Sequence, residues 1–265
     1  MKKYISLFAS HFSVALEYRS NLLGMFTLEL VSISSMVILW IAVYRTQEDV
    51  AGYSFYQAII YFVLIPLVGF ITQVDISEKL AKEIRMGTFS NYLLKPYTFW
   101  VAAFMEALAG KITYLIVTFS LTALVLGFLY VKGYLLFASG LLFSALFIAI
   151  LAFLLHFILD LCIAFWAFWT DNVWAFKHTK IILFGIVGGA SFPLDFLPEG
   201  LGAVARLLPF QYFYYVPVTY VLGKSGGTEK LISDGSHIIL WMITLALLCF
   251  LAWRAGLRRY DAYGY

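Results

Sequence analysis

The chain has 265 residues, of which 63% are hydrophobic and only 12% are charged, and its mean hydropathy is +0.89. Soluble globular domains are about 45–50% apolar and about 25% charged, so this composition excludes a soluble domain and indicates an integral membrane protein. The net charge of +3 is small, and we expect no nucleic-acid partner. Both cysteines, Cys162 and Cys249, lie in apolar segments, which favours small hydrophobic residues over a disulfide or a metal pair.

The first residues predict an amphipathic helix that lies along the membrane surface, because residues 1–20 place apolar side chains on one helical stripe beside basic ones. Residues 22–44 are long and apolar enough to cross a bilayer core of about 30 Å. A short polar connection leads to a second span at residues 55–74, which Pro66 is expected to kink.

A polar segment, residues 75–97, follows the second span. Its apolar residues recur at every fourth position, as in a helix: Ile76, Leu80 and Ile84. Asp75, with Glu78 three residues later, resembles a capping box, and Gly87 is expected to end the helix. The pattern suits a docking surface for a soluble partner or an ordinary solvated loop.

The remaining apolar segments predict spans over these ranges: 107–131, 134–169, 181–190 and 236–253. Residues 134–169 are long enough for one tilted helix or two short ones; we favour one, because residues 151–169 contain no turn residues. The chain then has six spans. With both termini in the cytoplasm, 13 of the 18 Lys and Arg residues lie inside, as the positive-inside rule requires.

Residues 191–225 are too broken for a spanning helix and too apolar for a solvated loop. Prolines and an aromatic run interrupt them: Pro193, Pro198, Pro209, Phe210 and Pro217. Irregular backbone at membrane depth is tolerated only where protein buries it or where it lines a cavity. We therefore expect short re-entrant or interfacial helices.

No catalytic motif, phosphate-binding loop or metal-ligand cluster is found in the sequence. Acidic residues in or near apolar spans are Glu29, Glu106 and Asp160, and His156 lies one helical turn before Asp160. Charged groups inside a bilayer are costly and suggest function. They fit a proton relay, a site for a cationic substrate, or simple hydrogen bonding between helices.

The order of features resembles the ABC type-2 exporter permeases, and most closely the stand-alone bacterial permeases of drug- and viologen-export systems. The matching motifs are RSNL at 19–22, EIRMG at 83–87, LLKP at 93–96, AFW at 164–166, GASFPL at 189–194, FLP at 196–198, LPF at 208–210, YVP at 215–217 and GLRRY at 256–260. Together they extend over nearly the whole chain.

The resemblance implies a single all-α permease domain, with an elbow helix at 1–21, a coupling helix within 75–97 and re-entrant extracellular helices at 191–225. The coupling residues would be Lys82, Glu83, Arg85, Gly87, Tyr92, Leu93 and Leu94. The partners would be a cytosolic ABC ATPase dimer, which binds ATP and magnesium, and a second copy or a related permease. The chain itself would need no cofactor and would lie in a bacterial inner membrane.

Two other functions remain open at this point. An ion- or proton-coupled transporter would use Glu29, His156 and Asp160, but such transporters often contain an internal repeat, and the broken region occurs only once here. A membrane-embedded enzyme would need a convergent polar set, which the sequence does not show.

Overall fold

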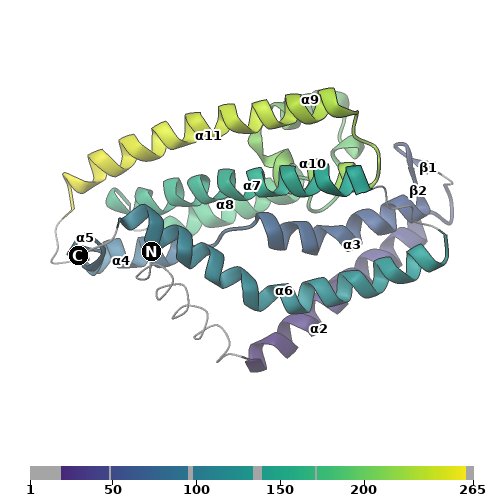
Figure 1. Cartoon of the computed structure of the whole chain (residues 1–265), viewed down its shortest axis with the longest axis horizontal. Helices are drawn as coiled ribbons and strands as arrows, with labels where there is room; N and C mark the ends of the chain where they lie inside the picture. Colours follow the sequence, from purple (N-terminus) through teal and green to yellow (C-terminus); the bar gives the residue numbers. More distant parts are fainter. Residues whose placement is uncertain (1–18, 48, 95–97, 134–138, 171, 261–265) are drawn as a thin grey trace.

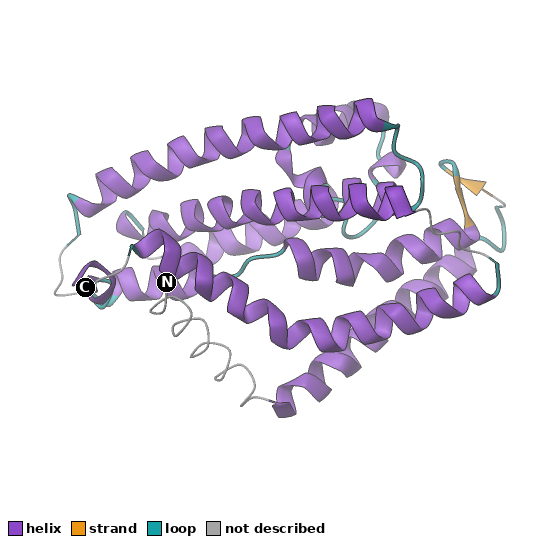
Figure 2. Cartoon of the chain, viewed as in Figure 1, coloured by secondary structure: helices purple, strands orange, loops and turns teal. Residues whose placement is uncertain are grey.

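The computed structural model describes residues 19–47, 49–94, 98–133, 139–170 and 172–260, and this part is almost entirely helical (Figures 1 and 2). Its strands form one short antiparallel hairpin of β1 (Asp49–Val50) and β2 (Tyr53–Ser54), in which Asp49 pairs with Ser54. The predicted all-α membrane fold is confirmed. The predicted elbow helix lies outside the described residues except for its last positions, which begin α2.

The helices follow one another in this order: α2 (Arg19–Val43), α3 (Phe55–Thr72), α4 (Ser77–Arg85), α5 (Ser90–Leu94), α6 (Phe99–Val131), α7 (Ser139–Phe165), η1 (Trp166–Phe168), α8 (Val173–Ile186), η2 (Leu194–Phe196), α9 (Glu199–Leu207), η3 (Pro209–Phe213), α10 (Tyr215–Val221) and α11 (Thr228–Leu257). The long helices run side by side between two ends of the molecule. Figure 1 shows α4 and α5 at one end, and the strand hairpin with α9 at the other. We call these the α4 end and the hairpin end.

Three stretches in the described part are long and apolar enough to cross a membrane: Phe55–Arg85, Gly140–Phe168 and Thr228–Leu257. The first of them runs through the non-helical residues 73–76 between α3 and α4. Shorter apolar stretches lie in α2 and α6: Leu30–Val43, Phe99–Ala109 and Thr118–Val131. The chain is therefore a multi-pass membrane protein, and the number of six spans stays a prediction.

Local sequence explains where several helices begin and end. Ser54 caps α3, because its hydroxyl accepts the N–H of Gln57 while the Gln57 side chain accepts the N–H of Ser54. The single helix expected within residues 134–169 is confirmed by α7. Three helices begin about two turns earlier than expected: α6 at Phe99, α8 at Val173 and α11 at Thr228. The first two turns of each helix contain at least one charged residue, so they were not included in the expected apolar spans.

The α4 end contains a large aromatic cluster. Phe89, which follows α4, is fully buried, and its ring packs against Phe99 of α6 and Trp253 of α11. Phe99 and Trp253 stack with ring centroids 4.9 Å apart. Tyr260 also reaches this end, where its hydroxyl donates to the carbonyl of Gly87 at 2.6 Å. The segment with α4 and α5 is therefore packed onto the ends of long helices and is not a loose loop.

At the hairpin end, the carboxylate of Asp195 in η2 connects several short elements to one another. Asp195 accepts hydrogen bonds from Tyr53 of β2 at 2.8 Å and from Tyr215 of α10 at 2.9 Å. It also pairs with Arg206 of α9 at 2.9 Å. Burial and the Asp195 charge raise the pKa of Tyr53 above its ordinary value, so its hydroxyl stays a donor. We call these four side chains the Asp195 network.

Candidate functional site

The candidate site is the polar α4–α5 segment, residues 77–94, which the long helices hold at one end of the molecule. The nine residues of α4 separate into two faces. Its buried face consists of Ser77, Leu80, Ala81 and Ile84. Its exposed face includes Glu78, Lys79 and Lys82. Gly87 follows with a φ of 72°, which favours glycine, and lets the chain reverse before α5.

The predicted capping box at the start of α4 is wrong. No side chain of the segment caps this helix, and both Asp75 and Glu78 pair instead with Lys177 of α8, at 3.1 Å and 2.7 Å. The buried N–H groups at the start of α4 donate to Asp160 of α7. Its Oδ2 accepts from the backbone of Ile76 at 2.7 Å and of Ser77 at 2.9 Å. The cap comes from a residue more than 80 positions away.

Asp160 belongs to a buried cluster with Lys180 of α8 and His156 of α7. The Lys180 ammonium lies 2.5 Å from Asp160 Oδ1 and 3.3 Å from His156 Nε2. It also donates to the carbonyl of Val74 at 3.3 Å. The side chains of Asp160 and Lys180 are only 0% and 7% exposed, so the pair is shielded from solvent and from salt. We call these three residues the Asp160 cluster.

A half-buried cation is the partner of the last carbonyls of α3 and of the residues after it. Lys111 of α6 donates to the carbonyl of Phe70 at 2.7 Å and to that of Gln73 at 2.5 Å. The C-terminus of a helix carries a partial negative charge and the N-terminus a partial positive one. The positive charge of Lys111 therefore complements the C-terminal end of α3, and the negative charge of Asp160 complements the N-terminal end of α4.

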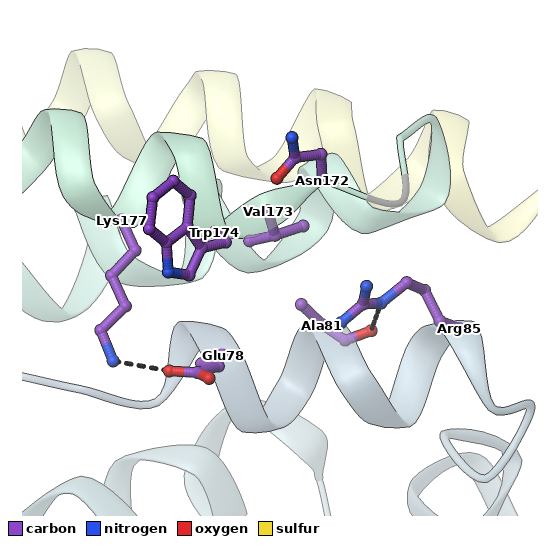
Figure 3. A pocket seen from close by; sticks show the side chains of 7 residues that line it. All are labelled: Glu78, Ala81, Arg85, Asn172, Val173, Trp174 and Lys177. Atoms are coloured by element: carbon purple, nitrogen blue, oxygen red, sulfur yellow. Dashed lines mark hydrogen bonds and ion pairs between the residues drawn. The ribbon is translucent and has the colours of Figure 1, made fainter.

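A groove of about 260 Å³ separates α4 from the first turn of α8 (Figure 3). Glu78, Ala81 and Arg85 line it from α4, and residues 172–174 with Lys177 line it from the other side. The hydrogen bond and the charge of Lys177 lower the pKa of Glu78, so the surface link between the two helices persists to more acidic pH than an isolated glutamate would allow.

The predicted coupling residues are distributed over both faces of the segment. Lys82 and Leu94 are exposed, Glu83 and Arg85 are half-buried, and the Tyr92 hydroxyl lies 3.5 Å from Glu106 Oε2. Leu93 lies in α5 and Glu29 in α2, but their side chains fall outside the described part. Two apolar side chains of the segment are exposed: Met86 directly after α4, at 60%, and Leu94 at the end of α5, at 83%.

The sequence analysis missed Lys111 and Lys180 as site residues. Both interrupt or border an apolar segment, which is the signal that could have revealed them, but they entered only the count of positive charges. His156 and Asp160 were predicted, and the structure brings them together at the start of α4. Among the described residues, no group of three or more His, Cys, Asp or Glu side chains is arranged to hold a metal ion.

The prolines within residues 191–225 lie at or near the starts of the short helices of this region. Pro193 precedes η2, Pro198 precedes α9, Pro209 opens η3 and Pro217 lies in the first turn of α10. Phe210 packs near Phe184 of α8, with ring centroids 5.8 Å apart. Figure 1 shows α9 near the hairpin end, whereas η3 reaches the end of α3, where Thr72 donates to the carbonyl of Phe213 and the ring of Phe213 lies 5.0 Å from that of His156.

Comparison with curated proteins and with solved structures gives no significant match. A family model described as ABC-2 family transporter protein matches residues 30–264. The match includes the whole α4–α5 segment, the Asp160 cluster and the broken region at residues 191–225. Because it extends over most of the chain, the protein belongs to the ABC-2 family of transporter proteins.

Proposed function

We propose that the chain is the permease subunit of an ATP-driven exporter and that a separate ATPase dimer binds its α4–α5 segment. The observation that supports this most directly is the surface of that segment. Charged Lys82 and apolar Met86 and Leu94 are exposed together at one end of the molecule. Exposed apolar side chains beside charged ones are typical of a protein-binding surface.

ATP and magnesium would be held by the ATPase subunits, and this chain would supply the part that moves. Closure of the two ATPases on ATP would displace α4, and the displacement would shift the permease between inward- and outward-facing states. A second copy of this chain, or a related permease, would complete the transport route. In this proposal the chain would cross a bacterial inner membrane six times, with both termini in the cytoplasm and residues 191–225 forming re-entrant helices on the outer side.

The substrate would be hydrophobic or amphipathic. An apolar groove of about 560 Å³ runs between α7 and α11 near the α4 end. Its lining is formed by aliphatic side chains and two tryptophans: Leu159, Cys162, Ile163, Trp166, Trp169, Leu245, Leu248 and Ala252. Such a surface favours apolar rings or chains over polar solutes.

The alternative of ion or proton coupling gains no support from the described residues. Asp160 accepts two backbone hydrogen bonds and pairs with Lys180, and these contacts give it a structural task. If it were instead a transport site, Asp160→Asn would abolish proton-dependent uptake of the fluorescent cation ethidium into vesicles.

The binding of the ATPase can be tested by co-purification. Lys82→Glu reverses a charge on the exposed face of α4. If this costs about 1–2 kcal/mol, the affinity for the ATPase falls about 5- to 30-fold, and we expect less ATPase to co-purify. Lys132→Glu makes the same change on an exposed residue just after α6, at the hairpin end, and should leave the complex intact. Equal recovery of the ATPase with both variants would contradict the proposal.

A further inference from the structure

We propose that Asp160 and Lys180 are positioning residues that fasten α4 to α7 and α8, so that α4 and the adjoining ends of these two helices move as one rigid unit. The inference rests on the proposed function of the α4–α5 segment. It specifies that a displacement of α4 is transmitted to the long helices through α7 and α8. It assigns the Asp160 cluster a task in coupling and not in the binding of substrate or ions.

The first support is the backbone of residues 74–76, whose polar groups are satisfied by side chains of other helices. The carbonyl of Val74 accepts a hydrogen bond from Lys180 of α8 at 3.3 Å, and the N–H of Ile76 donates to Asp160 of α7 at 2.7 Å. His156 of α7 lies against the same stretch, with its Nδ1 3.0 Å from the carbonyl of Thr72. These residues lie between the end of α3 and the start of α4, where the backbone groups at a helix terminus have no partner within the helix. The segment that leads into α4 is therefore held by α7 and α8 as well as by its covalent connection to α3.

The second support is the burial of the pair. The Asp160 carboxylate uses one oxygen for the start of α4 and the other for Lys180. Removing either partner would leave a charge buried and uncompensated, which is strongly unfavourable. This one ion pair therefore resists separation of α4, α7 and α8 from one another.

A surface link between α4 and α8 provides a contrast. Lys177 pairs with Asp75 and Glu78, whose side chains are 64% and 65% exposed. Exposed ion pairs are screened by water and salt and contribute little. Thus α8 binds the α4 region through an exposed ion pair of Lys177 and a buried ion pair of Lys180. We infer that the buried pair contributes most of the attachment.

The experiment uses the full chain in complex with its ATPase, with Cys162 and Cys249 replaced by alanine. Spin labels are attached through Lys79→Cys on α4 and Thr179→Cys on α8, both exposed, and the distance between them is measured with and without ATP and vanadate. We expect one narrow distance that nucleotide does not change. With Asp160→Asn added, we expect ATP hydrolysis to continue while the distance shifts on nucleotide addition, because the ATPase then moves α4 without α8.

The matched control is Asp234→Asn, which neutralises a carboxylate that is equally buried but lies at the start of α11, where it pairs with Lys230 and Tyr220. This control should behave as the parent. If Asp160→Asn does not fold, Asp160→Asn with Lys180→Met removes the uncompensated charge and takes its place in the measurement. Loss of global structure alone would change the label distance without making it depend on nucleotide.

Three results would overturn the inference: a distance that changes with nucleotide in the parent, an Asp160 variant that keeps the distance of the parent in both states, or a control that shifts as the Asp160 variant does. Failure of the proposed function gives a different result, in which no ATPase binds the parent chain and ATP and vanadate change nothing in any variant.

Discussion

Gly256, in the last turn of α11, lies at the α4 end in a position that has no room for a side chain. A Cβ atom added there would lie 2.1 Å from Cδ2 of Phe168, whose ring packs near Phe89 and Tyr260. The ring could not retreat without displacing the aromatic cluster beneath the α4–α5 segment.

We predict that Gly256→Ala destabilises the protein by about 1–3 kcal/mol, the usual cost of overpacking a core, and lowers its melting temperature in detergent. Gly127→Ala is the matched control, because a Cβ on this α6 glycine meets nothing within 4 Å. It should be neutral or slightly stabilising, since alanine favours helix more than glycine does. Similar melting temperatures for both variants would contradict the packing argument.

The turn after α4 depends on Gly87, which has a φ of 72°. We predict that Gly87→Ala costs about 1–2 kcal/mol, because other residues adopt this backbone conformation only with strain. It should also weaken binding of the ATPase, since it changes how α5 follows α4.

Gly133 offers a matched comparison, because it has a similar φ of 77° and open space around it but lies in the turn after α6. Gly133→Ala should lower the melting temperature to a similar extent while leaving ATPase co-purification unchanged. Equal loss of the complex in both variants would show that general stability, and not the α4–α5 turn, determines binding.

At the scale of elements, α8 binds the α4 region through two lysines of different burial. We predict that Lys177→Met changes the free energy of unfolding by no more than about 1 kcal/mol. Lys180→Met should cost about 3–5 kcal/mol, because it leaves Asp160 buried without its cation. Denaturant titration of the purified chain in detergent measures both, and equal costs would contradict the inference that the buried pair of Lys180 contributes most of the attachment.

The Lys177 link also has a defined pH dependence. The pKa of Glu78 is lowered in the folded protein, so its contribution is present above the pKa of the unfolded state and is lost as the pH falls through the folded value. The difference in stability between the parent and Lys177→Met should therefore be largest near neutral pH and vanish in acid. A stability difference that grows as the pH falls would contradict this predicted pH dependence.

Much of the element order could be predicted from the sequence. Four-residue spacing of apolar side chains located α4, and Gly87 located its end. The start of α4 could not be predicted, because its cap is Asp160, which is distant in sequence, whereas the local candidates Asp75 and Glu78 bind another helix. Lys180 was equally hidden, since a lysine beside an apolar segment looks the same whether it faces water or a buried carboxylate.

At the scale of the whole molecule, much of the exposed surface of α11 is apolar, as Leu247, Phe250 and Leu251 show. In contrast, α3 is largely enclosed by its neighbours. A helix that exposes so much apolar surface needs lipid or another protein around it. The bundle thus has an inner helix, α3, and an outer helix, α11, and this arrangement suits a protein embedded in a bilayer.

Topology gives a further test at this scale. If the α4 end faces the cytoplasm, single cysteines at Lys82 and Arg258 should react with a membrane-impermeant maleimide only in inverted vesicles. Cysteines at Lys132 and Gly226 should react only in intact cells or right-side-out vesicles. Native Cys162 and Cys249 are replaced by alanine beforehand. Labelling of Lys82→Cys from outside would reverse the proposed orientation.

The Asp195 network has a consequence for motion at the hairpin end. One carboxylate holds a strand, two short helices and the loop between them, so none of these pieces can depart without breaking hydrogen bonds to the same two oxygens. The strand hairpin and residues 194–208 are therefore expected to move as one unit in any conformational change at this end of the molecule.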